Sequence, residues 1–497
     1  MKREKIWTIL QIIALCVMAI SECLIVLLVI QLNVLPEKFL AVLIAGLIVA
    51  FMYLTLFMFV RIRAYVAMWR KIVSFLLAVI ISCGCILASK VALDALQLVN
   101  GITNGSDNAR NTYVLVLNEN SARDLADTKG YRYAALENFD VVHTEKMIAL
   151  IKEETKTDVY VEYFSNAAML ADALNNNQAD ALIMNGSSIS LLVEQEAYKD
   201  FLVRVRFLYT LPYESEENNN NNNNVEFSAK DPFVVYISGS DTRSSKLEVG
   251  RSDVNILVVV NPITKQILLL NTPRDYYVPN PAGNGILDKL THCSNYGVEC
   301  SVEALGSLYE VDISHYARIN FVGFEALIDA IDGITVYSDE RFMANGRTFI
   351  DYGENFLMGQ GALDFSRDRY HVSGGDRTRG NNQMKVLTAV INKMSSSTTL
   401  ISNYGAIMKS LEGMFSTSFQ NDEISEIVKM QLSEMPKWDI QSYAVSGSGD
   451  YQETYSWPGQ ELWVMQPDMK TVEHARDLIQ RILKSEMLTA EDMKMPS

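Results

Sequence analysis

The sequence predicts an α/β protein in which three N-terminal transmembrane helices precede a small α/β domain and a larger α/β domain. Three observations lead to this prediction. Apolar residues are concentrated before residue 100, strand-like and helix-like patterns alternate over residues 111–210, and a run of asparagines separates that stretch from a second part that combines a hairpin with a helix. At 497 residues the chain is also too long for one ordinary domain.

Three apolar stretches open the chain: Ile6–Leu32, Phe39–Val60 and Ile72–Ser89. Each has about the 18 to 20 residues that a helix needs to cross a ~30 Å hydrocarbon core. A cleavable signal peptide is the alternative for the first stretch, but that stretch is too long, lacks a small-residue cleavage site and is followed by two more spans. Glu22 interrupts the first stretch, and we expect it to face another helix, in a packing or a functional role.

Basic residues in the loops predict the orientation of these spans. They cluster before the first span and between the second and third, whereas the loop between the first two carries only Glu37 and Lys38. By the positive-inside rule the N-terminus and the second loop are cytoplasmic, so three crossings place everything after about residue 90 outside a cytoplasmic membrane. The basic residues concerned are Lys2, Arg3, Lys5, Arg61, Arg63, Arg70 and Lys71.

The overall charge argues against one class of function. The formal net charge is −16, whereas a nucleic-acid binder needs a whole face of clustered lysine and arginine. Any basic site must therefore be a local pocket in an acidic protein, and no nucleic-acid partner is expected.

Composition divides the chain after the spans. The run Asn218–Asn224 cannot bury a core and indicates a solvated linker. Upstream of it, no nucleophile–base pair or metal-ligand cluster stands out, so a binding or spacer role is expected there. The expected strands are Tyr113–Leu117, Val159–Phe164, Ala181–Met184 and Phe201–Phe207, and the expected helices are Thr144–Glu154, Ala167–Asn175 and Ser188–Tyr198. The expected domains are a membrane anchor (1–98), an accessory α/β domain (105–212), the linker (213–228), a larger α/β domain (229–470) and a C-terminal helix or tail (471–497), with an amphipathic helix over Val472–Met487.

Charged residues crowd the ends of the strands that follow the linker. A strand over Phe233–Ser238 ends near Asp241, and a hairpin of Val254–Val260 with Ile267–Asn271 is flanked by Asp253 and Arg274. Such crowding is typical of a site at the edge of a sheet. Each residue alone also has a structural explanation, as a turn cap or a surface ion pair.

The densest charged cluster lies between Ser366 and Gln383. Four arginines, Arg367, Arg369, Arg377 and Arg379, flank a pair of glycines, and a helix is expected over Asn382–Lys393. Arg379 and Gln383 are four residues apart, so they share a face if that helix begins early enough. Arginine forks grip phosphate oxygens bidentately, and several around a glycine-rich turn suit a pyrophosphate. The alternative is a solvated basic helix face that meets anionic lipid headgroups.

At this point the sequence resembles a known family. Six motifs in the order GSDTR, RSDVN, NTPRD, DKLTH, SRDRY and GGDRTRGNNQ make residues 231–395 similar to the catalytic domain of LytR–CpsA–Psr proteins. The three-span anchor followed by an extra α/β domain resembles the capsule-associated branch of that family. The resemblance implies an α/β catalytic domain with a mixed central sheet.

The resemblance also implies a function and a set of site residues. Such enzymes move a glycopolymer, capsule polysaccharide or teichoic acid, from an undecaprenyl-pyrophosphate carrier to peptidoglycan and form a phosphodiester. The implied partners are the polyprenyl-pyrophosphate-linked glycan, the peptidoglycan acceptor and membrane lipid, and the implied cofactor is Mg²⁺ or Mn²⁺. On that pattern Asp241 and Asp253 correspond to the metal ligands, and the pyrophosphate-binding residues correspond to Arg274, Lys289, Arg367, Arg369, Arg379 and Gln383.

The implied chemistry needs positioning and charge stabilisation more than covalent catalysis by the protein. Arg274, Arg367 and Arg379 would stabilise the charge of the transition state, and Asp253 is our hypothesis for the base that accepts the proton of the attacking sugar hydroxyl. Two other functions stay open. One is a lipid-pyrophosphate hydrolase or non-catalytic carrier-binding protein. The other is a transcriptional regulator, as older family naming suggests, against which the expected topology argues.

Two cysteines, Cys293 and Cys300, lie in the expected extracellular part. Their spacing permits a disulfide in an oxidising compartment but does not require one. Many proteins of the family that this chain resembles carry an apolar residue in place of Cys293, so the pair is a subgroup feature for which the resemblance favours a disulfide beside Lys289.

Overall fold

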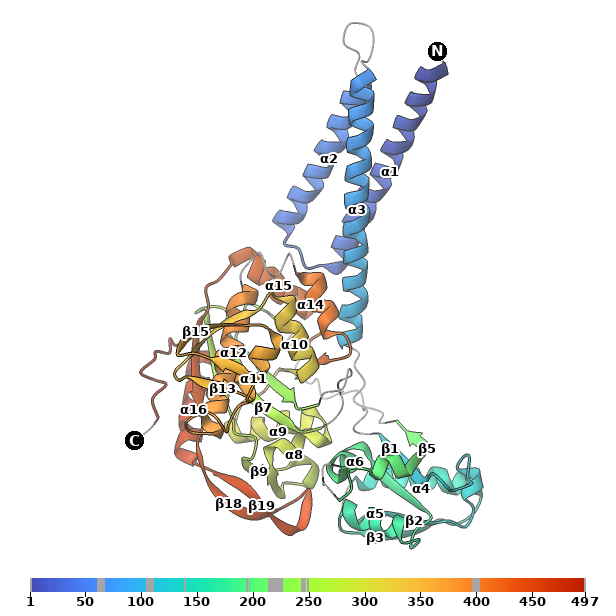
Figure 1. Cartoon of the computed structure of the whole chain (residues 1–497), viewed down its shortest axis with the longest axis vertical. Coiled ribbons are helices and arrows are strands. Elements are labelled where there is room, and N and C mark those ends of the chain that lie inside the picture. Colours follow the sequence, from blue (N-terminus) through green and yellow to red (C-terminus); the bar gives the residue numbers. More distant parts are fainter. Residues whose placement is uncertain are drawn as a thin grey trace. The chain divides into compact units, whose positions relative to one another are not determined.

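A computed structural model of the chain forms two compact units (Figure 1). The first contains the N-terminal helices with Asn392–Glu412 and Phe419–Lys437, and the second contains the rest from Gly105 onward. The residues that the structure describes are 2–59, 68–103, 111–137, 140–193, 195, 197–212, 227–242, 247, 250–395 and 403–495. The predicted Asn218–Asn224 linker lies outside them.

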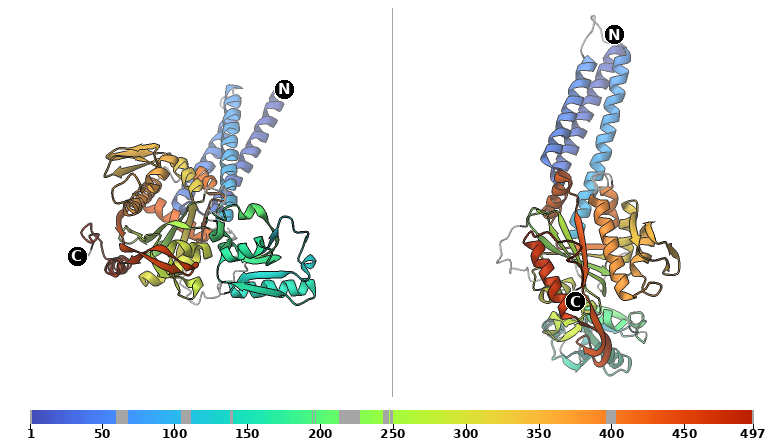
Figure 2. Two further views of the ribbon diagram at one scale, coloured as in Figure 1. Left: turned by 60° about the horizontal axis from the view of Figure 1, so that its bottom comes forward. Right: turned by 90° about the vertical axis from the view of Figure 1, so that its left-hand side faces the viewer.

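Three long apolar helices dominate the first unit. They are α1 (Lys2–Leu32), α2 (Glu37–Phe59) and α3 (Met68–Thr103), and they run side by side in both views of Figure 2. The segments Ile6–Leu32, Glu37–Phe59 and Met68–Leu93 are long and apolar enough to cross a membrane, which confirms the three predicted stretches. Glu22 is buried, as expected for a residue that faces another helix.

Two short helices from the C-terminal half of the sequence belong to this same unit. The helix α14 (Tyr404–Leu411) packs on α3, and α15 (Asn421–Glu434) contacts α3 and the end of α1. The hydrogen bonds that join α15 to the α1–α2 region are Lys429 Nζ to Asn33 Oδ1 at 2.6 Å, Lys38 Nζ to the Ser433 carbonyl at 3.0 Å and Ser425 Oγ to the Leu32 carbonyl at 3.4 Å.

The accessory domain is a five-stranded α/β layer structure. Its strand order is β3-β2-β4-β1-β5, with β2 parallel to β3 and β4, and β1 antiparallel to β4 and β5. Buried residues on one face pack on α5 and α6, and those on the other face pack on α4. The elements are β1 (Thr112–Leu117), β2 (Arg132–Leu136), α4 (Val141–Thr155), β3 (Tyr160–Phe164), α5 (Ala167–Asn175), β4 (Ala181–Asn185), α6 (Gly186–Val193), α7 (Phe201–Arg204) and β5 (Val205–Leu211).

One expected strand of this domain is partly wrong. Residues Phe201–Arg204 form the helical turn α7, and the strand β5 begins only at Val205. The fully buried Phe201 packs in the core with residues of α5 and α6. Apolar residues on both sides of the short turn make the segment resemble one continuous strand in the sequence.

The larger domain is built on a six-stranded mixed sheet of order β16-β11-β6-β7-β8-β17. The predicted hairpin is confirmed, since β7 and β8 pair antiparallel, and β6 pairs antiparallel with β7. The outer pairs β11–β6 and β17–β8 are parallel. The strands are β6 (Phe233–Ser240), β7 (Ser252–Asn261), β8 (Gln266–Asn271), β11 (His315–Asn320), β16 (Phe415–Thr417) and β17 (Asp439–Ala444).

Helices cover both faces of this sheet. On one face α9 (Val298–Tyr309) and α16 (Met469–Leu483) complete the main core, and on the other lie α10 (Phe321–Ala330), α11 (Gly359–Arg367) and α12 (Asp376–Ser395). The right-hand view of Figure 2 shows the red α16 and the orange helices on opposite sides of the sheet. The remaining elements are β9 (Tyr277–Pro279), β10 (Leu287–Lys289), α8 (Leu290–Cys293), β12 (Ile334–Ser338), β13 (Phe342–Ala344), β14 (Thr348–Ile350), β15 (Gly353–Leu357), β18 (Gly447–Thr454) and β19 (Trp457–Pro467).

Two expected boundaries change. The helix expected over Asn382–Lys393 begins six residues earlier, at Asp376, so Arg379 and Gln383 both lie within α12. The boundary expected at residue 470 does not separate a tail, because α16 buries Val472, Leu478 and other residues in the core of the larger domain.

Candidate functional site

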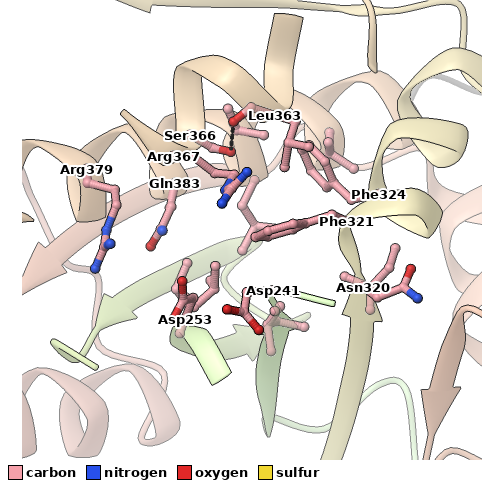
Figure 3. A pocket seen from close by; sticks show the side chains of 18 of the residues that line it. Asp241, Asp253, Asn320, Phe321, Phe324, Leu363, Ser366, Arg367, Arg379 and Gln383 are labelled. Carbon is pink, nitrogen blue, oxygen red and sulfur yellow. Dashed lines mark hydrogen bonds between the residues drawn. The ribbon is translucent and has the colours of Figure 1, made fainter. Parts of the chain in front are cut away.

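A cavity of about 460 Å³ lies between the sheet and the helices α10, α11 and α12. Its volume falls within the roughly 300–1,000 Å³ usual for small-molecule pockets. One end is lined by charged residues and the other by aliphatic and aromatic ones, as Figure 3 shows. The charged and amide side chains of the polar end are Asp241, Asp253, Arg274, Arg367, Arg369, Arg379 and Gln383.

Two carboxylates form the floor of the polar end. Asp241 follows the last residue of β6 and Asp253 is the second residue of β7, and the antiparallel pairing of these strands brings the two together. Gly239 allows β6 and β7 to pair closely here, since a Cβ at this position would lie 2.7 Å from the Val254 side chain. Partial burial raises the pKa of Asp241, and repulsion from Asp253 raises it further.

Arg274 is held between two carboxylates. Its Nη1 lies 2.7 Å from Asp253 Oδ1, and its Nε lies 3.3 Å from Asp275 Oδ2. Burial lowers the pKa of Arg274, but the two carboxylates outweigh it and hold the pKa above its ordinary value. The guanidinium is therefore a fixed cation beside the carboxylate pair, with its fork oriented by ion pairs on both sides.

The end of α11 and the turn after it supply two more cations. The Arg367 guanidinium lies over the Phe321 ring at 4.1 Å, and Arg369 lies over the Tyr370 ring at 4.8 Å and donates to its hydroxyl at 2.6 Å. The buried Asp368 between them accepts the backbone N–H groups of Tyr370 and His371, each at 2.9 Å. That carboxylate stabilises the turn after α11 in which Arg369 lies.

The first turns of α12 supply the last two polar groups. Arg379 and Gln383 lie one helical turn apart, both are buried, and both line the cavity, which agrees with the shared face expected from their spacing. Arg379 pairs with Asp376 at 2.5 Å. Burial lowers the pKa of Arg379, but an arginine stays charged at neutral pH. Figure 3 shows Arg367, Arg379 and Gln383 facing Asp253 and Asp241 across the polar end.

The carboxylate pair fits a hard divalent cation. Mg²⁺ and Mn²⁺ prefer oxygen ligands, and Mg²⁺ is commonly held by one or two carboxylates together with water and substrate phosphates. The repulsion that raises the pKa of Asp241 is what such a cation would relieve. No larger group of histidine, cysteine, aspartate and glutamate suited to a metal occurs in the part of the chain that the structure describes. The remaining ligands would have to come from substrate and water.

Lys289 occupies a different place from the other expected phosphate ligands. It does not line the cavity, and its Nζ pairs with Asp275 Oδ1 at 3.1 Å. Asp275 therefore lies between Lys289 and Arg274 and pairs with both. Its direct contact with a phosphate stays a prediction.

The two cysteines expected to be bonded are free thiols in the structure. Both are buried, on α8 and α9, and each sulfur has an oxygen acceptor: the Lys289 carbonyl at 3.9 Å for Cys293 and Asn280 Oδ1 at 3.3 Å for Cys300. A hydrogen bond with Cys300 and burial raise the pKa of the Cys293 thiol well above its ordinary value. The packing accommodates the two thiols without a disulfide bond.

The apolar end contains the residues that the sequence did not single out. Leu387 and Val390 belong to a helical stripe that looks like ordinary core packing, and Phe321 and Phe324 sit at the start of α10, where Asn320 caps the helix through Gly323 N at 2.8 Å. No signal in the sequence separates such a wall from a filled core. The apolar lining consists of Ile237, Ile256, Ala317, Ile319, Phe321, Phe324, Leu327, Leu363, Val386, Leu387, Val390 and Phe415.

The chain is similar to a known family and to named proteins. A profile described as the LytR_cpsA_psr family matches residues 208–471. The chain is 32% identical over 251 residues to the polyisoprenyl-teichoic acid–peptidoglycan teichoic acid transferase TagU of Enterococcus faecalis, covering 50% of this chain and 81% of that protein. It is 34% identical to the TagU of Halalkalibacterium halodurans, covering 44% and 66%. The crystal structure of B. subtilis TagV is 25% identical, with a TM-score of 0.43 over 52% of this chain and 99% of that one.

Proposed function

This chain belongs to the LytR_cpsA_psr family, and on that premise we propose that it is a membrane-anchored glycopolymer transferase. It would move a polysaccharide, of capsule or teichoic type, from an undecaprenyl-pyrophosphate carrier to peptidoglycan. The observation that carries this proposal is one cavity with a cluster of arginines and carboxylates at one end and an apolar wall at the other. A lipid-linked pyrophosphate has the same two-part chemistry.

The donor would place its pyrophosphate at the polar end and the adjoining part of its polyprenyl chain against the apolar wall. Arginine forks bind phosphate oxygens bidentately, and burial excludes the water that would weaken these bonds. Arg274 and Arg379 would hold one side of the pyrophosphate, and Arg367 the side toward Phe321, which its guanidinium covers.

The reaction is a displacement at the phosphorus that carries the glycan. An acceptor hydroxyl oxygen forms a new P–O bond, the bridging P–O bond breaks, and polyprenyl phosphate leaves with the bonding electrons. The hydroxyl proton would go to the carboxylate of Asp253, whose Oδ1 accepts a hydrogen bond from Arg274 at 2.7 Å. The arginines stabilise the charge that builds on the phosphate oxygens.

A divalent cation would be held by Asp241 and Asp253. When bound, it would polarise the phosphate and offset charge on the leaving group. The protein's own part is to keep the carboxylate pair in place through the β6–β7 pairing and to keep Arg274 beside it.

The anchor bears on where this reaction would occur. The carrier lipid is confined to the bilayer, so three spans keep the enzyme at a high effective concentration near it. The positive-inside rule favours the outer face of the cytoplasmic membrane, where peptidoglycan is. Labelling of single cysteines placed at residues 105 and 450 in intact cells would test this, and labelling only after permeabilisation would contradict it.

The decisive experiment uses the full chain in detergent micelles with Mg²⁺, a polyprenyl-pyrophosphate donor with a labelled glycan, and peptidoglycan oligosaccharides. We expect the label on the acceptor through a phosphodiester, with one polyprenyl phosphate released per bond formed. Polyprenyl phosphate with free labelled glycan and no phosphodiester would identify a hydrolase instead. Tight donor binding with no product would identify a carrier-binding protein.

A further inference from the structure

A second, smaller cavity adjoins the polar end of the first. It has a volume of about 170 Å³ and shares four lining residues with the larger cavity: Asp253, Arg274, Arg379 and Gln383. Its other walls come from the end of β8 and the residues after it, the start of α12, and the end of β17. Among the residues that line only this cavity are Asn271, Asp376, Arg377, Gly380, Ser446 and Met465.

From this arrangement we propose that the second cavity is the acceptor subsite, which binds the sugar ring whose hydroxyl attacks the phosphorus. The inference rests on the proposed transfer. The cavity is smaller than a complete small-molecule pocket, which suits one ring of a longer glycan. Its lining mixes charged side chains such as Asp376 and Arg377 with apolar ones such as Val445 and Met465. None of its lining residues is aromatic, unlike the wall that would take the lipid.

The order of the residues supports an in-line attack. In Figure 3 the labelled side chains run from Phe324 and Phe321 through Arg367 and Asp241 to Gln383, Asp253 and Arg379. The leaving polyprenyl phosphate would lie toward the phenylalanines. An attacking oxygen must approach from the opposite side of the phosphorus, roughly in line with the leaving oxygen. The second cavity shares Asp253, Arg379 and Gln383 with the first, and these are the labelled side chains farthest from the phenylalanines.

The walls of the second cavity are fixed before any ligand arrives. Gly380 brings α12 against β8, since a Cβ there would lie 2.5 Å from Asn271 Nδ2. The Ser446 carbonyl accepts the Tyr276 hydroxyl at 2.6 Å and the Asp468 N–H at 2.9 Å. A preformed site loses little ordering entropy when a sugar binds.

Arg377 is the residue that separates the two cavities experimentally. It lines the second cavity and not the first, and its side chain is exposed, so its replacement should leave the fold intact. Peptidoglycan carries carboxylates as well as hydroxyls, and the Arg377 guanidinium would bind one of them or a ring hydroxyl. Lys385 lies on the same helix, lines neither cavity and pairs with Asp339, which makes Lys385→Ala a matched control.

The test compares the wild type with Arg377→Ala, Arg377→Lys and Lys385→Ala in the transfer assay. We expect Arg377→Ala to raise the KM for the oligosaccharide acceptor about tenfold, with the donor KM unchanged and kcat within about twofold. Arg377→Lys should recover part of the loss, and Lys385→Ala should match the wild type. A rise in the donor KM alone would assign the cavity to the donor sugar, and no change in either KM would make Arg377 a surface cation; both results overturn the proposal.

A donor-free measurement keeps this test separate from the proposed reaction. Equilibrium binding of soluble peptidoglycan oligosaccharide to the full chain in micelles should weaken about tenfold in Arg377→Ala and not in Lys385→Ala. If the wild type binds the oligosaccharide in this way but forms no phosphodiester, the transferase reading fails while the glycan subsite stands. If the oligosaccharide binds all these proteins equally, the subsite fails.

Discussion

The polar and apolar ends of the 460 Å³ cavity are built on the same sheet and the same three helices, yet each depends on a different kind of contact. At the polar end every cation has a named partner, such as Asp253 and Asp275 for Arg274 or Asp376 for Arg379. At the apolar end the side chains contact one another without direction. A buried charge without a partner destabilises the fold, so each cation of the polar end needs a specific partner in a specific geometry. An apolar wall tolerates many packing arrangements.

This difference predicts unequal effects of mutation. Substitutions at the polar end should reduce the chemical step by orders of magnitude, because they remove groups fixed in one geometry. Substitutions at the apolar end should mainly change donor affinity in proportion to the area lost. The following predictions test that contrast in order of expected size.

The largest effect is expected for Asp253→Ala. Loss of the proposed base and of one cation ligand should lower the transfer rate about 10³-fold, while donor affinity falls less than about tenfold. Single-turnover transfer and equilibrium binding of the donor measure the two quantities on the same preparation. An equal loss of transfer and of donor binding would remove Asp253 as the base.

Arg367→Ala tests the border between the two ends. The guanidinium lies over Phe321 at 4.1 Å, and its loss should lower kcat/KM about 10²-fold, mostly through charge stabilisation. Arg341→Ala is the matched control, since Arg341 forms an exposed ion pair with Asp351 and should have no effect on kcat/KM. A loss of less than threefold in Arg367→Ala would place this arginine outside the transition-state contacts.

Phe324→Ala tests the apolar end. Removal of the ring should raise the KM for a donor with a long polyprenyl chain about tenfold and leave kcat nearly unchanged. A donor with a short, water-soluble chain should bind the variant and the wild type equally. The contrast between the two ends breaks if the short-chain donor is affected just as strongly.

The smallest effect concerns stability and its dependence on pH. Burial and Asp253 raise the pKa of Asp241, so the folded protein holds this proton to a higher pH than the unfolded chain does. The contribution of Asp241 to the free energy of unfolding therefore falls as pH rises from the unfolded pKa through the raised folded pKa. Asp241→Asn should melt slightly higher than the wild type near neutral pH without a divalent cation, and the difference should vanish in acid.

The same melting experiment tests the cation. Mg²⁺ that binds the folded wild type should raise its melting temperature and should do so far less in Asp241→Asn. An identical Mg²⁺ response in both proteins would show that the cation binds elsewhere. Mn²⁺ can be tested in parallel.

The contrast between the two ends also explains what the sequence could predict. Arg379 is recognisable because clustered arginines stand out in an acidic chain, and Gln383 because it lies one helical turn further on; the structure places both in the cavity. Phe321 and Val390 are not recognisable as cavity residues, because in the sequence an apolar residue that lines a cavity has the same pattern as one in a filled core. The sequence does not reveal the strand β2, and it predicts a strand over the Phe201–Arg204 turn, because short apolar runs have no distinct period.

The charged motifs also contain residues whose role is structural. Asp368 lies between two cavity arginines, but its oxygens accept backbone N–H groups and the His371 ring. Sequence alone gives such residues the same weight as Asp253, because only the direction of the side chain tells them apart.

The membrane anchor makes specific contacts with the helices α14 and α15, so its sequence matters for more than its hydropathy. Both come from the part of the chain that the family profile covers, yet they pack with the apolar spans, and Lys429 bonds Asn33 in the turn between α1 and α2. A generic apolar helix grafted in place of residues 1–103 would retain the chain at a bilayer but would leave α14 and α15 without their partners. The anchor and the family domain should therefore be inherited, exchanged and expressed as one piece.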